Sequence, residues 1–184
     1  MEERKYERLF YRFRPEYLAG TIDGRELHDT SPQSSFRGGC QIPGANYNVS
    51  YRLIREACLL DPYPHKHTAD EYLVFGSETM NGRDWDAEVE ITIGLGEDAE
   101  TYVIDRPATI FIPAGTWHCP LNFKRVEKPV FFQPSLMQPM FGGVYQLPDG
   151  EKEIYYNGQI QCVLEPEKKC TSCRKCLQID WRKP

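Results

Sequence analysis

The sequence predicts an all-β protein whose antiparallel strands form a barrel. Its 184 residues include 14 prolines and 14 glycines, which favour turns, and 11 tyrosines and 9 phenylalanines, which favour strands. Short apolar or alternating segments recur between these turn residues, a pattern typical of a sandwich or barrel. At this length we expect one compact domain with extensions at both ends.

The predicted strands lie between residues 47 and 133, which we expect to form the barrel core. Alternation is clearest in residues 87–94, where Val89, Ile91 and Ile93 face inward and the polar residues between them face outward. A glycine-rich turn follows, so residues 101–104 are expected to pair back as a hairpin. Further strands are expected at residues 47–55, 72–75, 109–112, 130–133 and from residue 118 onward.

Both ends of the chain are predicted to lie outside this core. Residues 1–46 are expected to form an N-terminal extension, in which Tyr6, Leu9, Phe10 and Phe13 have the spacing of a short amphipathic helix. Residues 15–46 look irregular. Residues 134–184 are expected to form a C-terminal arm that begins as a proline- and glycine-rich loop over 134–150 and ends in a cysteine-rich tail.

The strand at 47–55 has one unusually polar face. Asn48, Ser50 and Arg52 alternate with the apolar residues of the other face and share theirs with Ile54. Such a face can line a pocket in which Arg52 meets an anionic substrate. An Arg52 that faces solvent fits the pattern equally well.

The central chemical feature is a set of histidines in two short blocks. His65 and His67 are two residues apart and share a strand face, and Glu71 shares it too if the strand continues. His118 follows a predicted turn at Pro113 and can lie opposite them in a folded sheet. Three imidazoles and one carboxylate suit a divalent transition metal. The alternative is that isolated histidines only satisfy hydrogen bonds.

These blocks resemble the two motifs of the cupin superfamily. The first motif, His-x-His and then Glu, is met by His65, His67 and Glu71, and the second, Pro-x-Gly-x-x-His-x-x-x-Asn, by Pro113, Gly115, His118 and Asn122. Leu59 and Pro107 stand where a leading glycine is expected, and Gly76 comes two residues early, with Glu78 in its usual place. Those glycines serve turns, so the departures concern loop shape rather than ligation.

The resemblance implies a jelly-roll barrel, also called a double-stranded β-helix, with a single Fe, Mn, Ni or Zn ion bound inside it. Asn122 then becomes a second pocket residue beside Arg52. The resemblance implies an enzyme of undetermined reaction class, a dioxygenase, decarboxylase or isomerase, acting on a small polar or carboxylate-bearing metabolite. The alternative is a non-catalytic protein that binds or senses a small molecule through its metal. A homodimer is also implied.

The C-terminal tail holds a second cluster of metal-binding residue types. Cys170, Cys173 and Cys176 form a Cys-x-x-Cys-x-x-Cys run that resembles the opening of a bacterial ferredoxin cluster motif. Cys162 can complete a four-thiolate zinc or iron–sulfur site, although its spacing fits no standard signature. A tail with free thiols is the alternative.

Charge and hydropathy exclude other classes of partner. A formal net charge of −5 argues against general nucleic-acid binding. No run of eighteen apolar residues exists to span a membrane. The charged N-terminus lacks the apolar segment of a signal peptide, so we expect a cytoplasmic location.

Overall fold

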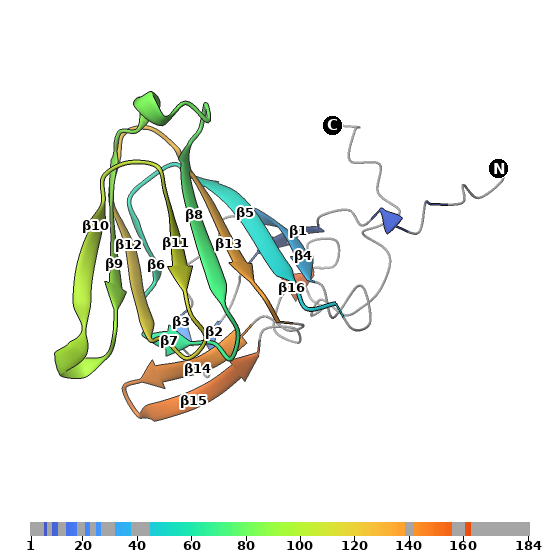
Figure 1. Ribbon diagram of the computed structural model, residues 1–184, viewed down its shortest axis with the longest axis vertical. Coiled ribbons are helices and arrows are strands. Elements are labelled where there is room, and N and C mark those ends of the chain that lie inside the picture. The colour runs from blue at the N-terminus through green and yellow to red at the C-terminus, as the bar shows by residue number, and fades with distance from the viewer. Residues whose placement is uncertain are drawn as a thin grey trace.

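The computed structural model describes residues 6, 9–10, 14–17, 21–22, 25–26, 32–37, 45–138, 142–155 and 161–162. Within these residues the chain is built from strands, with two short 3-10 helices at Gly82–Asp84 and Gly96–Asp98. The strands form two large antiparallel sheets and a small two-stranded one (Figure 1). The all-β prediction is confirmed.

The first sheet has seven strands, and the second faces it. In spatial order the first contains β11 (Ala108–Ile112), β8 (Glu71–Ser77), β13 (Val130–Leu136), β5 (Asn48–Ile54), β4 (Pro32–Arg37), β1 (Arg14–Tyr17) and β16 (Gln161–Cys162). The second contains β10 (Glu100–Ile104), β9 (Ala87–Ile93), β12 (His118–Val126), β7 (His65–Lys66), β14 (Gly142–Leu147) and β15 (Gly150–Tyr155), with β6 (Cys58–Asp61) also paired to β12. The small sheet pairs β2 (Thr21–Ile22) with β3 (Arg25–Glu26).

The predicted barrel is not closed. In the described part of the chain, β11 and β16 remain the edges of the first sheet, and β10 and β15 remain those of the second. The architecture is therefore an open sandwich of facing sheets. Period-two alternation shows which face of a strand is buried, but it does not show whether the edge strands of two sheets pair.

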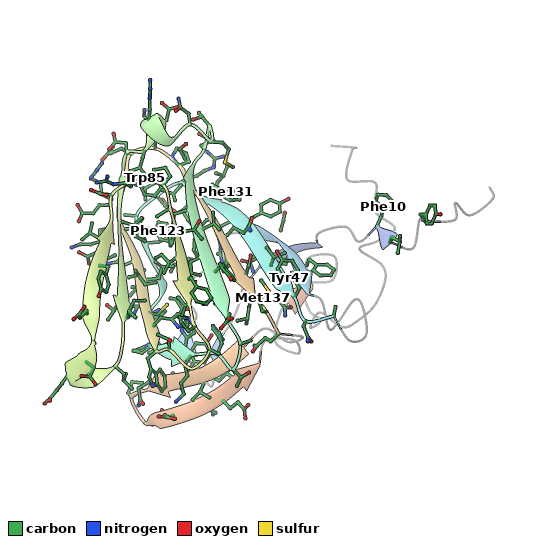
Figure 2. The ribbon with its side chains drawn as sticks, viewed as in Figure 1. Phe10, Tyr47, Trp85, Phe123, Phe131 and Met137 are labelled. Carbon is green, nitrogen blue, oxygen red and sulfur yellow. The ribbon has the colours of Figure 1, made fainter. Side chains whose placement is uncertain are left out.

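An aromatic core joins the two sheets. Phe75 on β8 and Phe132 on β13 have ring centroids 5.1 Å apart, and Phe123 on β12 lies 5.8 Å from Phe132. All three are at most 3% exposed. Figure 2 shows Phe123 and the half-buried Trp85 in the upper part of the sandwich, whereas β7 and β14 lie at its lower end (Figure 1). β7, which carries His65, therefore lies at the end away from the aromatic core.

The expected N-terminal helix is not seen. Of residues 1–14, the structure describes Tyr6, Leu9, Phe10 and Arg14, and the Leu9 amide donates to the Tyr6 carbonyl at 2.9 Å in a single turn. The remaining residues of this segment lie outside the described part. Propensity and spacing alone rarely stabilise so short a helix.

Two segments expected to be irregular contain strands. β4 pairs with β5 through Ser35 and Ser50, so part of residues 15–46 extends the first sheet. β14 pairs with β7 through Tyr145 and His65, so part of residues 134–150 extends the second. The sequence predicts turns rather than strands in these segments, because prolines and glycines lie in or beside them and usually mark turns. The division of the chain at residues 46 and 133 stays a prediction.

No helix among the described residues has both the length and the apolar character that a membrane crossing requires.

Candidate metal centre

Four side chains meet between the two sheets at the lower end of the sandwich. These are His65, His67, Glu71 and His118, and one ligand atom from each lies within 4.8 Å of the others. All four residues are at most 5% exposed. Two far-separated blocks of sequence thus converge on one buried point.

The chain reaches this arrangement by changing sheets rather than by continuing one strand. β7 ends at Lys66 in the second sheet, and β8 begins at Glu71 in the first. His118 is the cross-strand partner of His65 on β12. Two histidines therefore come from one sheet, the glutamate from the facing sheet and His67 from the crossing segment. The predicted residues meet, although the strand does not continue from His67 to Glu71.

The turn that precedes His118 holds the crossing segment in place. The Thr116 amide donates to the Pro113 carbonyl at 3.1 Å, and Gly115 has φ 81°, the positive value that a type II turn needs at this position. The Gly115 amide then donates to the His67 carbonyl at 2.8 Å, and the Ala114 amide donates to Asp70 Oδ1 at 2.9 Å. The Asp70 side chain thus helps to hold the turn in place.

Backbone carbonyls fix the orientation of all three imidazoles. Nδ1 of His65 lies 3.0 Å from the Tyr63 carbonyl, Nδ1 of His67 lies 2.8 Å from the Gly142 carbonyl, and Nδ1 of His118 lies 3.0 Å from the Thr116 carbonyl. A carbonyl only accepts, so each Nδ1 carries the hydrogen and donates it. In a neutral ring the Nε2 lone pair is then available, as in metal-binding histidines.

The Glu71 carboxylate lies against two of these nitrogens. Its Oε2 is 3.0 Å from His118 Nε2 and 3.5 Å from His67 Nε2. Burial alone would raise the pKa of Glu71, but His67 and His118 together hold it well below its usual range. The carboxylate is therefore negative, and it faces nitrogens whose neutral form presents lone pairs. A cation satisfies all of these groups at once.

The histidines differ in their protonation. Burial lowers the pKa of His65 well below its ordinary value, and the neighbouring His118 and His67 lower it further. Burial opposes a charge on His67 as well, but Glu71 outweighs it and raises the pKa of His67. Without a metal, a proton on His67 stabilises the carboxylate, and a metal ion would replace that proton.

Several supporting residues were not predicted from the sequence. Tyr145 on β14 stacks on His65 with centroids 4.6 Å apart, and Gln138 Nε2 donates to the Gly142 carbonyl at 2.7 Å beside His67. A Cβ atom on Gly143 would lie 2.3 Å from the Lys66 carbonyl oxygen and 2.8 Å from His67 Nδ1. Only glycine fits there. The Gly142-Gly143 pair was the available signal, because glycines within a strand mark close backbone approach.

Arg52 and Asn122 lie in different environments. Arg52 is 6% exposed and shares the inward face of β5 with Ile54 of the core. Asn122 does not reach the cluster, because the register of β12 shifts between His118 and Leu121. This bulge turns Leu121 and Phe123 inward, so the half-buried Asn122 between them faces outward, opposite Glu90. Asn122 is four residues after His118 and would share its face in an unbroken strand, but a one-residue bulge reverses that parity.

The cysteine tail lies largely outside the described residues. Cys170, Cys173 and Cys176 are not described, and Cys162 is described only as a β16 residue paired with Glu16 of β1. A thiolate site there stays a prediction.

No protein-family model matches this chain, and no curated protein matches it. Solved structures similar to it include vicilin from Corylus avellana, with 15% identity, a TM-score of 0.44 and coverage of 80% of this chain and 36% of that one. Oxalate decarboxylase from Bacillus subtilis shows 10% identity, a TM-score of 0.43 and coverage of 67% and 28%. Hydroxypropylphosphonic acid epoxidase from S. wedmorenis shows 13% identity, a TM-score of 0.32 and coverage of 49% and 42%.

These solved structures have the cupin fold. This chain spans about a third of the length of the first two, and identities and TM-scores this low assign none of their activities to it. Its own facing antiparallel sheets, with both sequence motifs converging between them, give it a cupin-type fold. The cluster has the residue types of a three-histidine, one-glutamate metal site.

Proposed function

We propose that the chain binds one divalent transition metal ion through Nε2 of His65, His67 and His118 and the carboxylate of Glu71. The observation that carries the proposal is that all three Nδ1 atoms donate to backbone carbonyls, while Nε2 of His67 and His118 lie 3.5 and 3.0 Å from Glu71 Oε2 and His65 belongs to the same cluster. Imidazole nitrogens with one carboxylate suit Fe, Mn, Ni or Zn. A structural hydrogen-bond network would not need three identical tautomers.

We further propose that the chain is an enzyme for a small polar or carboxylate-bearing metabolite. Four protein ligands leave coordination positions for an oxygen ligand, and a bound metal ion supplies Lewis acidity there. The chain's own part is to hold the imidazoles by their Nδ1 hydrogen bonds and to exclude water around them, which burial of all four residues supports. Non-catalytic binding of a small molecule remains the second candidate, because the same open positions serve it.

Elemental analysis of anaerobically purified protein tests the metal proposal. The Cys170→Ser/Cys173→Ser/Cys176→Ser variant should hold about one equivalent of metal. Adding His65→Ala/His67→Ala to this variant should remove the metal, whereas adding His28→Gln, which changes the only histidine outside both motifs, should keep it. Metal retained after the first addition would reject the site. A wild type that holds a second equivalent of zinc or iron, which the cysteine variant loses, would support the tail site.

Catalysis and binding are distinguished by product formation. Under catalysis, His118→Ala abolishes turnover of a candidate metabolite while circular dichroism still shows the fold. Under pure binding, the wild type retains an affinity for the metabolite and yields no product either in air or anaerobically. Light scattering tests the predicted homodimer.

A further inference from the structure

The inward face of β4 and β5 forms a second polar cluster inside the sandwich. Ser35 on β4 is the cross-strand partner of Ser50 on β5, so both side chains lie on one face. Gln33 is two residues from Ser35 on β4, and Arg52 is two residues from Ser50 on β5, so both share that face. Ile54 continues the same side of β5 into the apolar core. All four polar residues are buried, at 6% exposure or less.

Two of these side chains are buried without satisfying their hydrogen-bonding groups. Neither the amide nitrogen nor the amide oxygen of Gln33 has a hydrogen-bond partner, and neither does the Ser35 hydroxyl. Asn48 Oδ1, on the same face of β5, also lacks one. Native proteins pair nearly all buried polar groups because leaving them unpaired is costly. Three neighbouring side chains with unpaired polar groups point to a ligand that supplies their hydrogen-bond partners.

One side chain, that of Leu136, separates this cluster from Glu71 of the metal centre. Leu136 on β13 is the cross-strand partner both of Asn48 on β5 and of Glu71 on β8. Asn48 Nδ2 donates to the Gln138 carbonyl, and Gln138 Nε2 donates to the Gly142 carbonyl that also holds His67. One continuous sheet face therefore runs from Gln33 to Glu71.

The charge of the cluster selects an anion. Arg52 places a guanidinium group on this face, and a guanidinium recognises carboxylate through paired N–H donors. Gln33 and Ser35 offer both donors and acceptors, which suit hydroxyl groups. The cluster thus has complementary groups for a molecule that carries both a carboxylate and hydroxyls.

We propose that Gln33, Ser35, Ser50 and Arg52 bind a small hydroxylated carboxylate on the inward face of β4 and β5. As the substrate class of the metal centre this inference rests on the proposed function, whereas the binding site itself stands without the metal. Arg52 holds the carboxylate, and Gln33 and Ser35 bond to the hydroxyls. The metal centre lies on the same sheet face, beyond Leu136.

Calorimetric titration of the full chain with gluconate tests the site, and sorbitol serves as the matched neutral polyol. The wild type should bind gluconate and not sorbitol. Gln33→Leu/Ser35→Ala should weaken gluconate binding by about tenfold or more, because it removes the groups that contact the hydroxyls. The control Gln133→Leu, on the outward face of the neighbouring strand, should bind like the wild type.

Thermal unfolding without ligand supplies a second readout. Gln33→Leu/Ser35→Ala should unfold at the same temperature as the wild type or higher, because it removes buried polar groups that have no partner. If this variant does not fold, the smaller change Ser35→Ala should still weaken gluconate binding. A drop in the unfolding temperature together with unchanged gluconate binding would show that the groups bind only structural water, and would overturn the site.

Two other outcomes also overturn the proposal. They are no gluconate binding by the wild type at about 10 mM, and sorbitol binding as tight as that of gluconate. Metal content measured on the same samples separates the two proposals. Metal present without gluconate binding rejects this site alone. If the wild type contains no metal but binds gluconate, and Gln33→Leu/Ser35→Ala loses that binding, only the metal centre is rejected.

Discussion

His118 Nε2 lies 3.0 Å from Glu71 Oε2, and this contact joins the two sheets of the sandwich. His118 begins β12 in one sheet, and Glu71 begins β8 in the other. Each residue is buried and each belongs to a different sequence motif. The pair therefore forms only after the sheets have packed together, so the metal centre depends on the complete fold.

Replacing the carboxylate should abolish tight metal binding. Glu71→Gln keeps the size of the side chain but removes its charge, and we expect the metal affinity to fall by at least about 100-fold, since even residues behind the ligands commonly cost 10- to 100-fold. Equilibrium dialysis measures this. Glu97→Gln, on the exposed 3-10 helix Gly96–Asp98, is the control and should bind metal normally. Equal affinities in both variants would contradict the ligand role.

Adding one methyl group to β14 should disturb the histidine cluster from behind. In Gly143→Ala, the new Cβ would collide with the Lys66 carbonyl and His67 Nδ1. We expect a loss of about 1–3 kcal/mol in unfolding free energy and weaker metal binding. Urea titration measures the first. Gly82→Ala should change little, because its Cβ would meet only Pro107 at an ordinary 3.8 Å.

Metal binding should weaken on acidification. The pKa of His67 is raised, so in the metal-free protein this ring holds its proton to a higher pH than a free histidine does. A metal ion must displace that proton, and affinity should therefore rise with pH until the raised pKa is passed. Titrations that also follow proton release check this. A metal affinity that does not change with pH below the raised pKa of His67 would contradict competition between metal and proton at this residue.

The metal-free protein should show the opposite trend in stability. Because the folded-state pKa of His67 lies above its unfolded value, its contribution is present below the ordinary histidine pKa and is lost as pH rises through the raised one. Because the pKa of Glu71 is lowered, this residue contributes its full stabilisation at every pH above the ordinary carboxyl pKa. Its contribution to the free energy of unfolding is therefore constant over this range. Unfolding temperatures of the metal-free protein should fall as the pH rises from about 7, just above the ordinary histidine pKa, through the raised pKa of His67. A His67→Gln control should lack this fall.

Loss of the hydrogen bond between the Ala114 amide and Asp70 should affect the site without removing a proposed ligand. Asp70→Ala removes the acceptor for the Ala114 amide, and we expect a loss of about 1 kcal/mol in unfolding free energy and about tenfold in metal affinity. Urea titration and dialysis measure these. Asp105→Ala, an exposed change beside Arg106, should alter neither quantity. Unchanged binding in the Asp70 variant would show that the turn is held by other contacts.

The convergence of these four residues could be predicted from the sequence because metal binding requires particular residue types at compatible spacings. His65, His67, Glu71 and His118 meet as expected, although Glu71 arrives through a change of sheet rather than along one strand. Spacing constrained the outcome even though the strand breaks between His67 and Glu71.

Other features could not be predicted, since they depend on contacts distant in sequence. Asn122 faces outward because of a bulge, and one inserted residue in a strand leaves no clear trace in composition. The position of β4 depends on pairing with β5 rather than on its own weak alternation. The support of His67 by the Gly142 carbonyl involves a backbone atom, which no residue pattern marks.

The change of sheet between Lys66 and Glu71 has a mechanical consequence. An ion held by His65 and His118 on one side and by Glu71 on the other would cross-link two strands that belong to different sheets. Removing the ion should let the two β-sheets separate at the lower end of the sandwich. The phenylalanine-filled upper end would keep the layers joined, so amide hydrogen exchange should increase in β7 and β14 before it increases in β13.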